Sequence, residues 1–95
     1  MKLVLTEAAL EDLRAIRAYT VETWGSAQEA AYLRRIWTRF RSIRDHPEIF
    51  RSREDLFPGC RIASEGCHVI LFRVEGESLQ VIRVLHSAMD FKKHL

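Results

Sequence analysis

The sequence predicts an α+β fold in which a helical hairpin packs on an antiparallel β-sheet. Two long segments with helical apolar spacing come first, at about residues 7–24 and 27–45. Three shorter apolar segments, separated by tight turns, then fit strands. With a short apolar segment at the start, the predicted order is β-α-α-β-β-β. The 95 residues are enough for one domain, which we expect to span residues 1–95.

The first strand is predicted at residues 2–5 and the first helix directly after it. Thr6 can cap this helix, because its hydroxyl can accept a hydrogen bond from a free backbone N–H. Gly25 ends the helix, and Ser26 is expected to cap the next one. The apolar stripe of the first helix consists of Ala9, Leu13, Ile16 and Tyr19 or Thr20.

The second helix is predicted from about Ala27 to Asp45, and Pro47 prevents much continuation. The short turn between the two helices makes them an antiparallel hairpin. The apolar positions of the second helix are Ala30, Leu33, Ile36, Trp37, Phe40 and Ile43.

The sheet is expected from three strands in the second half of the chain. Residues 46–58 are predicted to be irregular, and the tail from Ala88 to Leu95 to form one or two helical turns. Tight turns between the strands make them antiparallel neighbours. The middle strand is apolar on both faces at residues 69–72, which predicts a central position with cover on both sides. The predicted strands are Cys60–Ser64, His68–Val74 and Leu79–Leu85, with turns at Glu65-Gly66 and Glu75-Gly76-Glu77.

Composition indicates a soluble globular chain, with 47% apolar and 29% charged residues. No apolar run can cross a bilayer, and acidic residues interrupt the first apolar stretch too early for a signal peptide, so we expect a cytoplasmic protein with no membrane partner. The segment from Arg34 to Arg53 carries seven arginines against two acidic residues. This segment is either a solvated helix face or the binding site of an acidic partner, which would be a nucleic acid or an acidic protein segment.

The sequence predicts no cofactor and no metal site. Cys60 and Cys67 match no metal-ligand spacing and are expected to be reduced thiols packed in the sheet. The four histidines show no helical or hairpin pairing, and the four glycines are isolated in turns rather than gathered in a phosphate loop.

Nearly the whole chain resembles a ParE toxin of the RelE/ParE superfamily. The resemblance is most specific at the C-terminal end, from Arg83-Val84-Leu85-His86 through Met89-Asp90 to His94-Leu95. Its other parts are Leu5-Thr6, Ala9, Asp12-Leu13, Ile16, Tyr19, Trp24-Gly25, Ala31-Tyr32, His46-Pro47 and Arg61 after Pro58-Gly59.

This resemblance implies a RelE-like fold and a protein that acts by binding rather than by catalysis. The implied target is DNA gyrase, held on cleaved DNA so that replication stops. The implied partner is a ParD-like antitoxin with a ribbon-helix-helix end that binds DNA and a tail that wraps the toxin. The hetero-oligomeric complex would repress its own operon, so operator DNA would be contacted only through the antitoxin.

We expect the antitoxin to bind the helical hairpin. The second helix is predicted to present the stripe Leu33, Trp37 and Phe40 with arginines beside it, which suits an amphipathic partner helix. Trp37 is the expected anchor, with the sheet-facing core as the alternative location for its side chain. The expected antitoxin-binding residues are Tyr19, Leu33, Arg35, Trp37, Arg39 and Phe40.

The C-terminal half is expected to contact the target. For His86 the alternative is a structural histidine bonded to backbone near the tail, and strand alternation would place Arg83 on the same face as Val81. The expected target-binding residues are Arg61, Arg83, His86, Met89, Asp90 and His94.

Two other functions are open on the sequence. One is a ribosome-dependent mRNA endonuclease of the RelE type, built from Arg61, Arg83, His86 and one of Glu65, His68 or Asp90. The basic loop and the tyrosine near the C-terminus that this branch uses are missing, which disfavours it. The other is a small nucleic-acid-binding module that uses the arginine-rich segment.

Overall fold

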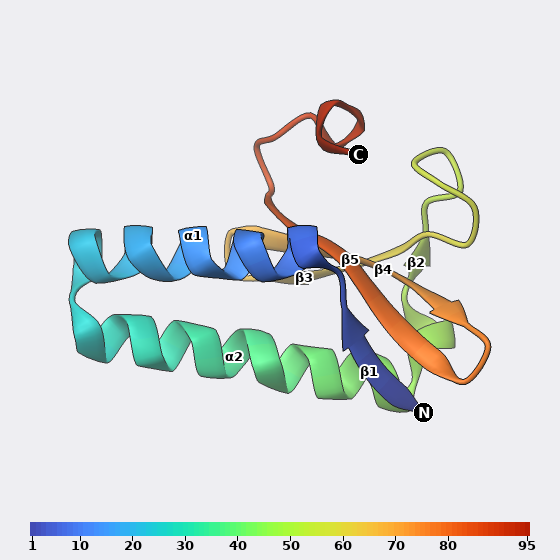
Figure 1. Ribbon diagram of the computed structural model, residues 1–95, viewed down its shortest axis with the longest axis horizontal. Helices are drawn as coiled ribbons and strands as arrows, with labels where there is room; N and C mark the ends of the chain where they lie inside the picture. The colour runs from blue at the N-terminus through green and yellow to red at the C-terminus, as the bar shows by residue number, and fades with distance from the viewer.

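The computed structural model describes all 95 residues and has the predicted α+β architecture (Figure 1). Helices α1 (Glu7–Trp24) and α2 (Ser26–Asp45) form an antiparallel hairpin that covers one face of the sheet. The strands are β1 (Lys2–Leu5), β2 (Arg51–Ser52), β3 (Arg61–Glu65), β4 (His68–Glu75) and β5 (Ser78–His86). Two short 3₁₀ helices complete the chain, η1 (Pro47–Ile49) and η2 (Phe91–His94).

The five strands form one sheet in the order β1-β5-β4-β3-β2. Strands β3, β4 and β5 are antiparallel neighbours, as predicted. Strand β1 pairs in parallel with β5, from Lys2 opposite Ser78 to Leu5 opposite Val81, which the sequence did not specify. The start of the chain therefore lies beside its last strand.

Two local predictions differ from the structure. Part of the segment predicted to be irregular forms η1 and the two-residue strand β2, which pairs with β3. The expected cap at Ser26 is wrong, because Ser26 is already the first residue of α2 and no side chain caps that end. Gly25 occupies the cap position with a φ of 88°, so the chain turns from α1 into α2 within a single residue.

The sheet has a packed core on each face. The larger core lies between the sheet and the helical hairpin and includes Ile36, Phe40 and Phe72. On the opposite face, Leu71 and Leu85 pack under the residues that precede β3 and under Phe91 of η2. Residues 69–72 of β4 are all buried, which confirms the prediction of a central strand covered on both sides.

A β-bulge in β5 changes the direction of the side chains that follow it. Leu71 pairs with Arg83 and Phe72 pairs with Val81, so Ile82 is an extra residue on β5. Val81 and Val84 both face the helical core. The expectation that Arg83 shares a face with Val81 is therefore wrong, since the extra residue reverses the alternation.

Helix α1 replaces a neighbouring strand along the second half of β5. Strand β1 ends opposite Val81, and beyond that point the backbone N–H of Val84 donates to Asp12 Oδ2 at 2.9 Å. Both Asp12 oxygens also accept from Arg83, from Nε at 2.7 Å and from Nη2 at 2.8 Å. Thr6 caps α1 as predicted and donates its hydroxyl to the carbonyl of Ile82 at 2.7 Å. These contacts fix the start of α1 on the sheet.

Neither long helix has an apolar stretch sufficient to span a lipid bilayer.

We predict that Asp12→Ala lowers the free energy of unfolding by about 2–3 kcal/mol, because it leaves the Arg83 guanidinium and the Val84 N–H without their partner. Urea denaturation monitored by tryptophan fluorescence measures the change. Glu11→Ala, on the exposed side of the same helical turn, is the control and should change it by less than about 0.5 kcal/mol. Equal losses for the two variants would contradict this role of Asp12.

Candidate functional site

The outward side of α2 carries an exposed aromatic surface centred on Trp37. The Trp37 side chain keeps 37% of its area exposed and meets Phe40 edge-on, with 5.1 Å between the ring centres. It borders a shallow hollow of about 450 Å³. We call this area the Trp37 surface; its lining residues are Glu29, Ala30, Leu33, Arg34, Trp37, Thr38 and Arg41.

Phe40 does not belong to this surface, so its place among the expected antitoxin contacts is wrong. Its side chain is completely buried in the helical core. Leu33 is half-buried and packs against the same core. Trp37 thus lies on the outer side of Phe40. Its partly exposed side chain is at the edge of the core and does not face the sheet.

Arg35 and Arg39 lie on the other side of α2 from Trp37. Residues two positions apart differ by about 200° around a helix, so Arg35 and Arg39 point away from Trp37. Both reach Glu65 at the end of β3, with N–O distances of 3.3 Å and 3.4 Å. The arginines beside Trp37 are instead Arg34 and Arg41. The expected binding surface is therefore divided into two sides of one helix.

The other side of α2 faces a second hollow, under the tip of the helical hairpin. Tyr19 and Trp24 of α1 are among the most exposed aromatics of the chain, at 66% and 68%. Together with Arg35 they border a cavity of about 370 Å³ that reaches the β3–β4 turn. We call it the tip cavity; its lining residues are Tyr19, Thr20, Trp24, Gln28, Tyr32, Arg35, Cys67 and His68.

Tyr32 connects the tip cavity to the sheet, and sequence reasoning did not give it a role. Its hydroxyl lies 2.6 Å from His68 Nδ1 and 3.1 Å from the carbonyl of Glu65. A Cβ at Gly66 would come within 2.7 Å of the Tyr32 ring, so only glycine fits this turn. Helical spacing from Gln28 and Arg35 places Tyr32 on their side of α2, which is the signal that could have identified it.

The ionisation of this cluster is shifted by its burial. Burial, followed by the Cys67 thiol, raises the pKa of Tyr32 to about 12, so the phenol stays protonated. Burial, followed by the proximity of His86, lowers the pKa of His68 below its usual range. The rings of His68 and His86 meet edge-on with 5.6 Å between their centres. Tyr32 and His68 are therefore both neutral near pH 7.

Arg83 joins three parts of the chain, namely β5, α1 and the tail. Besides its two bonds to Asp12, its Nη1 donates to the backbone carbonyl of His94 in the tail. The paired carboxylate raises the pKa of Arg83, so its charge is permanent. Arg83, His94 and Leu95 border a hollow of about 440 Å³ beneath the tail. Two expected target-binding residues, Arg83 and His94, are thus brought together.

Arg61 is not part of that group. It shares the helical face of β3 with Ala63, and its Nη1 donates to the carbonyl of Phe50 at 2.6 Å. Arg83 lies on the other face, with Leu85, and β4 separates the strands of the two arginines. Arg61 therefore fastens the segment after η1 to the sheet.

The remaining expected target residues lie at the end of β5 and in the tail. His86 Nδ1 accepts from the backbone N–H of Ala88 at 3.0 Å, which is the structural role considered as its alternative. Asp90 caps η2 by accepting from the N–H of Lys92. Met89 keeps 44% of its area exposed and packs into neither core.

The residues considered for RNA cleavage do not converge. Arg61 and Arg83 are on opposite faces, and each is held by a bond to another part of the chain. His86 is bonded to backbone and lies against His68. Attack by a 2′-hydroxyl needs a base, an acid and a cation within hydrogen-bond reach of one phosphate. This set does not provide that arrangement.

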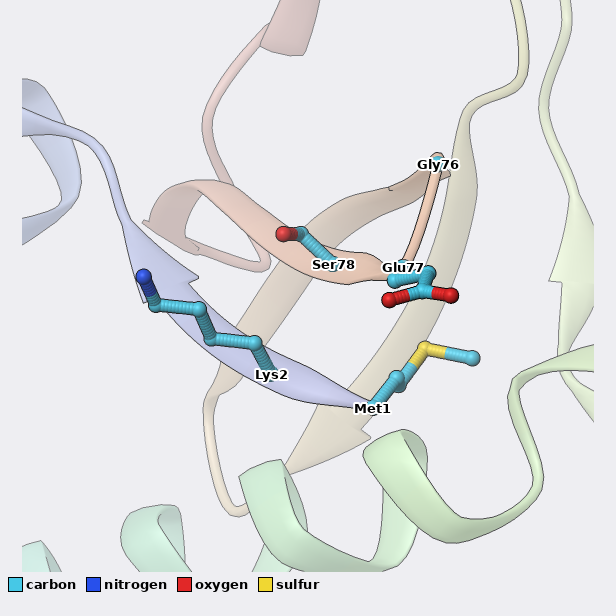
Figure 2. Close-up of a pocket in the computed structure, with 5 residues that line it drawn as sticks. All are labelled: Met1, Lys2, Gly76, Glu77 and Ser78. Atoms are coloured by element: carbon cyan, nitrogen blue, oxygen red, sulfur yellow. The ribbon is translucent and has the colours of Figure 1, made fainter.

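Two further features carry no chemistry of this kind. The hollow at the β1–β5 end of the sheet is bordered by Met1, Lys2, Gly76, Glu77 and Ser78, and the Lys2 side chain points away from Glu77 (Figure 2).

Cys60 is buried, which raises its pKa to about 11, and both cysteines are free thiols. Cys60 fits the expected packed thiol, whereas Cys67 lies exposed in the β3–β4 turn, contrary to the expectation for it.

Comparison with known proteins identifies the family. Residues 3–91 match the family model described as the ParE toxin of the type II toxin–antitoxin system parDE. The chain belongs to the ParE toxin family.

Relatives named as ParE toxins align with this toxin over nearly its full length. It is 36% identical to Toxin ParE1 of Caulobacter vibrioides over 91 residues, which are 96% of this chain and 94% of the relative. It is also 36% identical to Toxin ParE1 of Mycobacterium tuberculosis over 93 residues, which are 97% and 95% of the two chains. The identity with Toxin ParE of Escherichia coli is 32%, over 97% of this chain and 90% of that one.

A solved structure described as the chromosomal ParDE TA system from P. aeruginosa has the same fold. The TM-score is 0.78 at 24% identity, and the match covers 90% of this toxin and 95% of that chain. The expected RelE-like, ParE-type fold is thereby confirmed, and the toxin is a ParE-type component of a type II toxin–antitoxin system.

We predict that Phe40→Ala destabilises this toxin much more than Trp37→Ala. Loss of Phe40 leaves a cavity in the core and should lower the free energy of unfolding by about 3–5 kcal/mol. Loss of the half-exposed Trp37 should cost about 1–2 kcal/mol and leave a folded protein. Thermal denaturation followed by circular dichroism measures both. A Trp37→Ala variant as unstable as Phe40→Ala would mean that Trp37 is a core residue.

We predict that His68 makes the toxin less stable at mildly acidic pH. Its pKa is lower in the folded than in the unfolded state, so unfolding binds a proton between the folded value and about 6.5. Stability is then full above about pH 6.5 and falls as the pH drops through that window. His68→Asn keeps a hydrogen-bonding group beside the Tyr32 hydroxyl without titrating. The slope of unfolding free energy between pH 5 and 7 should be shallower in this variant; an unchanged slope contradicts the assignment.

Proposed function

We propose that this toxin inhibits DNA gyrase, and so DNA replication, by binding it, and that a cognate ParD-like antitoxin neutralises it. The observation that carries the proposal is the family match, which spans residues 3–91 and agrees with toxins named ParE at 36% identity over nearly the whole chain. A binding mechanism is supported by the lack of convergence among the candidate catalytic residues.

The antitoxin is proposed to bind on α2. Trp37 offers a large apolar contact area at the surface, and the neighbouring Arg34 and Arg41 form none of the ion pairs seen in the chain. An amphipathic helix with apolar anchors and flanking carboxylates is the complement of such a surface. Apolar anchors supply most of the affinity at an interface of this kind, and the arginines speed association and select the partner.

Four of the seven arginines in the arginine-rich segment are in ion pairs, which argues against this segment as a nucleic-acid surface. Arg35 and Arg39 pair with Glu65, and Arg44 and Arg53 pair with neighbouring aspartates. Phosphate binding depends on unpaired cations aligned along one face. We therefore propose that operator DNA is contacted only through the ribbon-helix-helix end of the antitoxin, in a hetero-oligomeric complex.

The target is proposed to contact the end of β5 and the tail. Met89 and Asp90 are exposed there, and His94 is held beside Arg83 by its backbone. Phe91 anchors this segment in the second core, so the short η2 has a fixed position on the body. A fixed, exposed terminal segment distant from α2 would let target and antitoxin use different surfaces.

We predict that induction of the toxin without antitoxin causes DNA-damage signalling and filamentation without mRNA cleavage. A damage-responsive reporter measures the first effect, and primer extension on cellular messages measures the second. Codon-specific cuts in ribosome-bound messages would contradict the proposal and favour the endonuclease.

A tail variant tests where the target binds. Removing residues 92–95 keeps Phe91 in its core, so the fold is retained, and toxicity should fall while antitoxin affinity changes less than twofold. Deleting residues 91–95 also removes Phe91 from the smaller core. This variant shows the effect of destabilisation on toxicity. Full toxicity of the shorter deletion at equal protein abundance would exclude His94 from the target contacts.

A further inference from the structure

A polar recess lies beside the Trp37 surface on α2, with Thr38 between the two. It has a volume of about 300 Å³ and no apolar lining residue. Four of its residues follow one helical stripe of α2, and the fifth comes from the β3–β4 end of the sheet. We call it the arginine recess; its lining residues are Arg35, Thr38, Arg39, Ser42 and Glu65.

The recess contains more positive than negative charge. Arg35 and Arg39 bring two permanent charges, and Glu65 brings the only carboxylate. Arg35 donates from Nε to Glu65 Oε2 at 3.3 Å. Arg39 Nε is buried and 3.4 Å from Glu65 Oε1, but it is not aligned for a hydrogen bond and has no partner. A single carboxylate thus satisfies the two guanidinium groups incompletely, and a buried donor without a partner is unfavourable.

Glu65 is held in place by its backbone rather than by its side chain. Its carbonyl accepts from the Tyr32 hydroxyl, and the glycine that follows it packs tightly on the Tyr32 ring. The carboxylate forms ion pairs with the two arginines, whose side chains are 58% and 38% exposed, while the Glu65 side chain is 17% exposed. The carboxylate can therefore move aside, or admit a second carboxylate, without any change in the backbone.

The recess and the tip cavity are neighbours on α2, because Arg35 lines both. The tip cavity offers aromatic walls from Tyr19, Trp24 and Tyr32. An occupant that fits the two hollows together has an apolar side chain for the cavity and a carboxylate for the recess. The negative charge of Glu65 disfavours the repeated phosphates of a nucleic acid, and the neighbouring cavity with aromatic walls favours a protein segment.

We propose that the arginine recess binds a carboxylate of an acidic segment of the antitoxin, and that Glu65 occupies its place in the free toxin. This inference rests on the proposed antitoxin, and it assigns a second contact side to it. Glu65 then competes with the partner, so its removal should strengthen binding, whereas removal of an ordinary contact residue weakens it. The inference is testable because the two roles predict opposite changes in antitoxin affinity when the Glu65 carboxylate is removed.

The test compares Glu65→Gln with Glu48→Gln, which changes the net charge equally in an exposed turn away from the recess. The ligand is the immobilised ribbon-helix-helix protein encoded beside the toxin gene, and surface plasmon resonance in low and high salt gives the rate constants. We expect Glu65→Gln to lower Kd about tenfold in low salt, with less effect in high salt, and Glu48→Gln to lower it by less than twofold.

A double variant keeps the test decisive if Glu65→Gln is poorly folded. Arg35→Gln with Arg39→Gln removes the charges that attract the partner and should raise Kd at least tenfold, mainly through a slower association rate. Equal Kd values for Glu65→Gln and Glu48→Gln, or weaker binding by Glu65→Gln than by the unaltered toxin, would overturn the inference. So would tighter binding of a DNA duplex by Glu65→Gln with no gain for the antitoxin.

The outcomes also separate this inference from the proposed function. If the unaltered toxin does not bind the neighbouring protein, the antitoxin proposal fails. If it binds but the Glu65 and Glu48 variants behave alike, only the role of the recess fails.

Discussion

The Asp12–Arg83 pair is the interaction on which the arrangement of this molecule depends. One carboxylate accepts from the Arg83 side chain and from the backbone of the next residue, and the same guanidinium holds the C-terminal tail by a carbonyl. Strand β1 is too short to cover the whole edge of β5, so α1 provides the missing acceptor through Asp12. Because the pair is mostly shielded from water, at 21% and 13% side-chain exposure, removal of one partner destabilises the fold more than it would at a surface ion pair. It positions the helical hairpin and the tail relative to the sheet at the same time.

That arrangement leaves α2 with two exposed sides of different chemistry. One side presents Trp37 over the core with Arg34 and Arg41 free beside it. The other presents Arg35 and Arg39, which are held by Glu65 and lie next to an aromatic cavity. A partner that uses both sides must wrap the helix, which suits an extended protein segment better than a rigid domain. The apolar side can set the affinity for a partner, and the charged side can set the selectivity among partners. The two properties can therefore change separately.

Local patterns predicted most of the fold, and contacts between distant segments explain what they missed. Helical and strand periodicity identified both helices and the three-stranded meander, and the doubly apolar run at residues 69–72 identified the central strand. The parallel pairing of β1 joins it to β5, a strand about 80 residues away in the sequence. The bulge at Ile82 depends on the register with β4, about 10 residues away. The local spacing of apolar residues predicts neither feature. The bulge then reversed the direction predicted for Arg83. Among the candidate site residues, Phe40 was misassigned because a helical stripe does not tell which of two adjacent aromatics faces the sheet. Tyr32 was missed because its partners come from the β3–β4 turn.

The central claim is that antitoxin and target use separate surfaces of one rigid toxin. Hydrogen–deuterium exchange of the toxin, free and bound to its antitoxin, tests this most directly. The account predicts added protection in peptides that cover residues 28–42 and the turn at residues 65–68, with unchanged exchange in residues 87–95. Protection confined to the end of β5 and the tail, with α2 exchanging as in the free toxin, would contradict it.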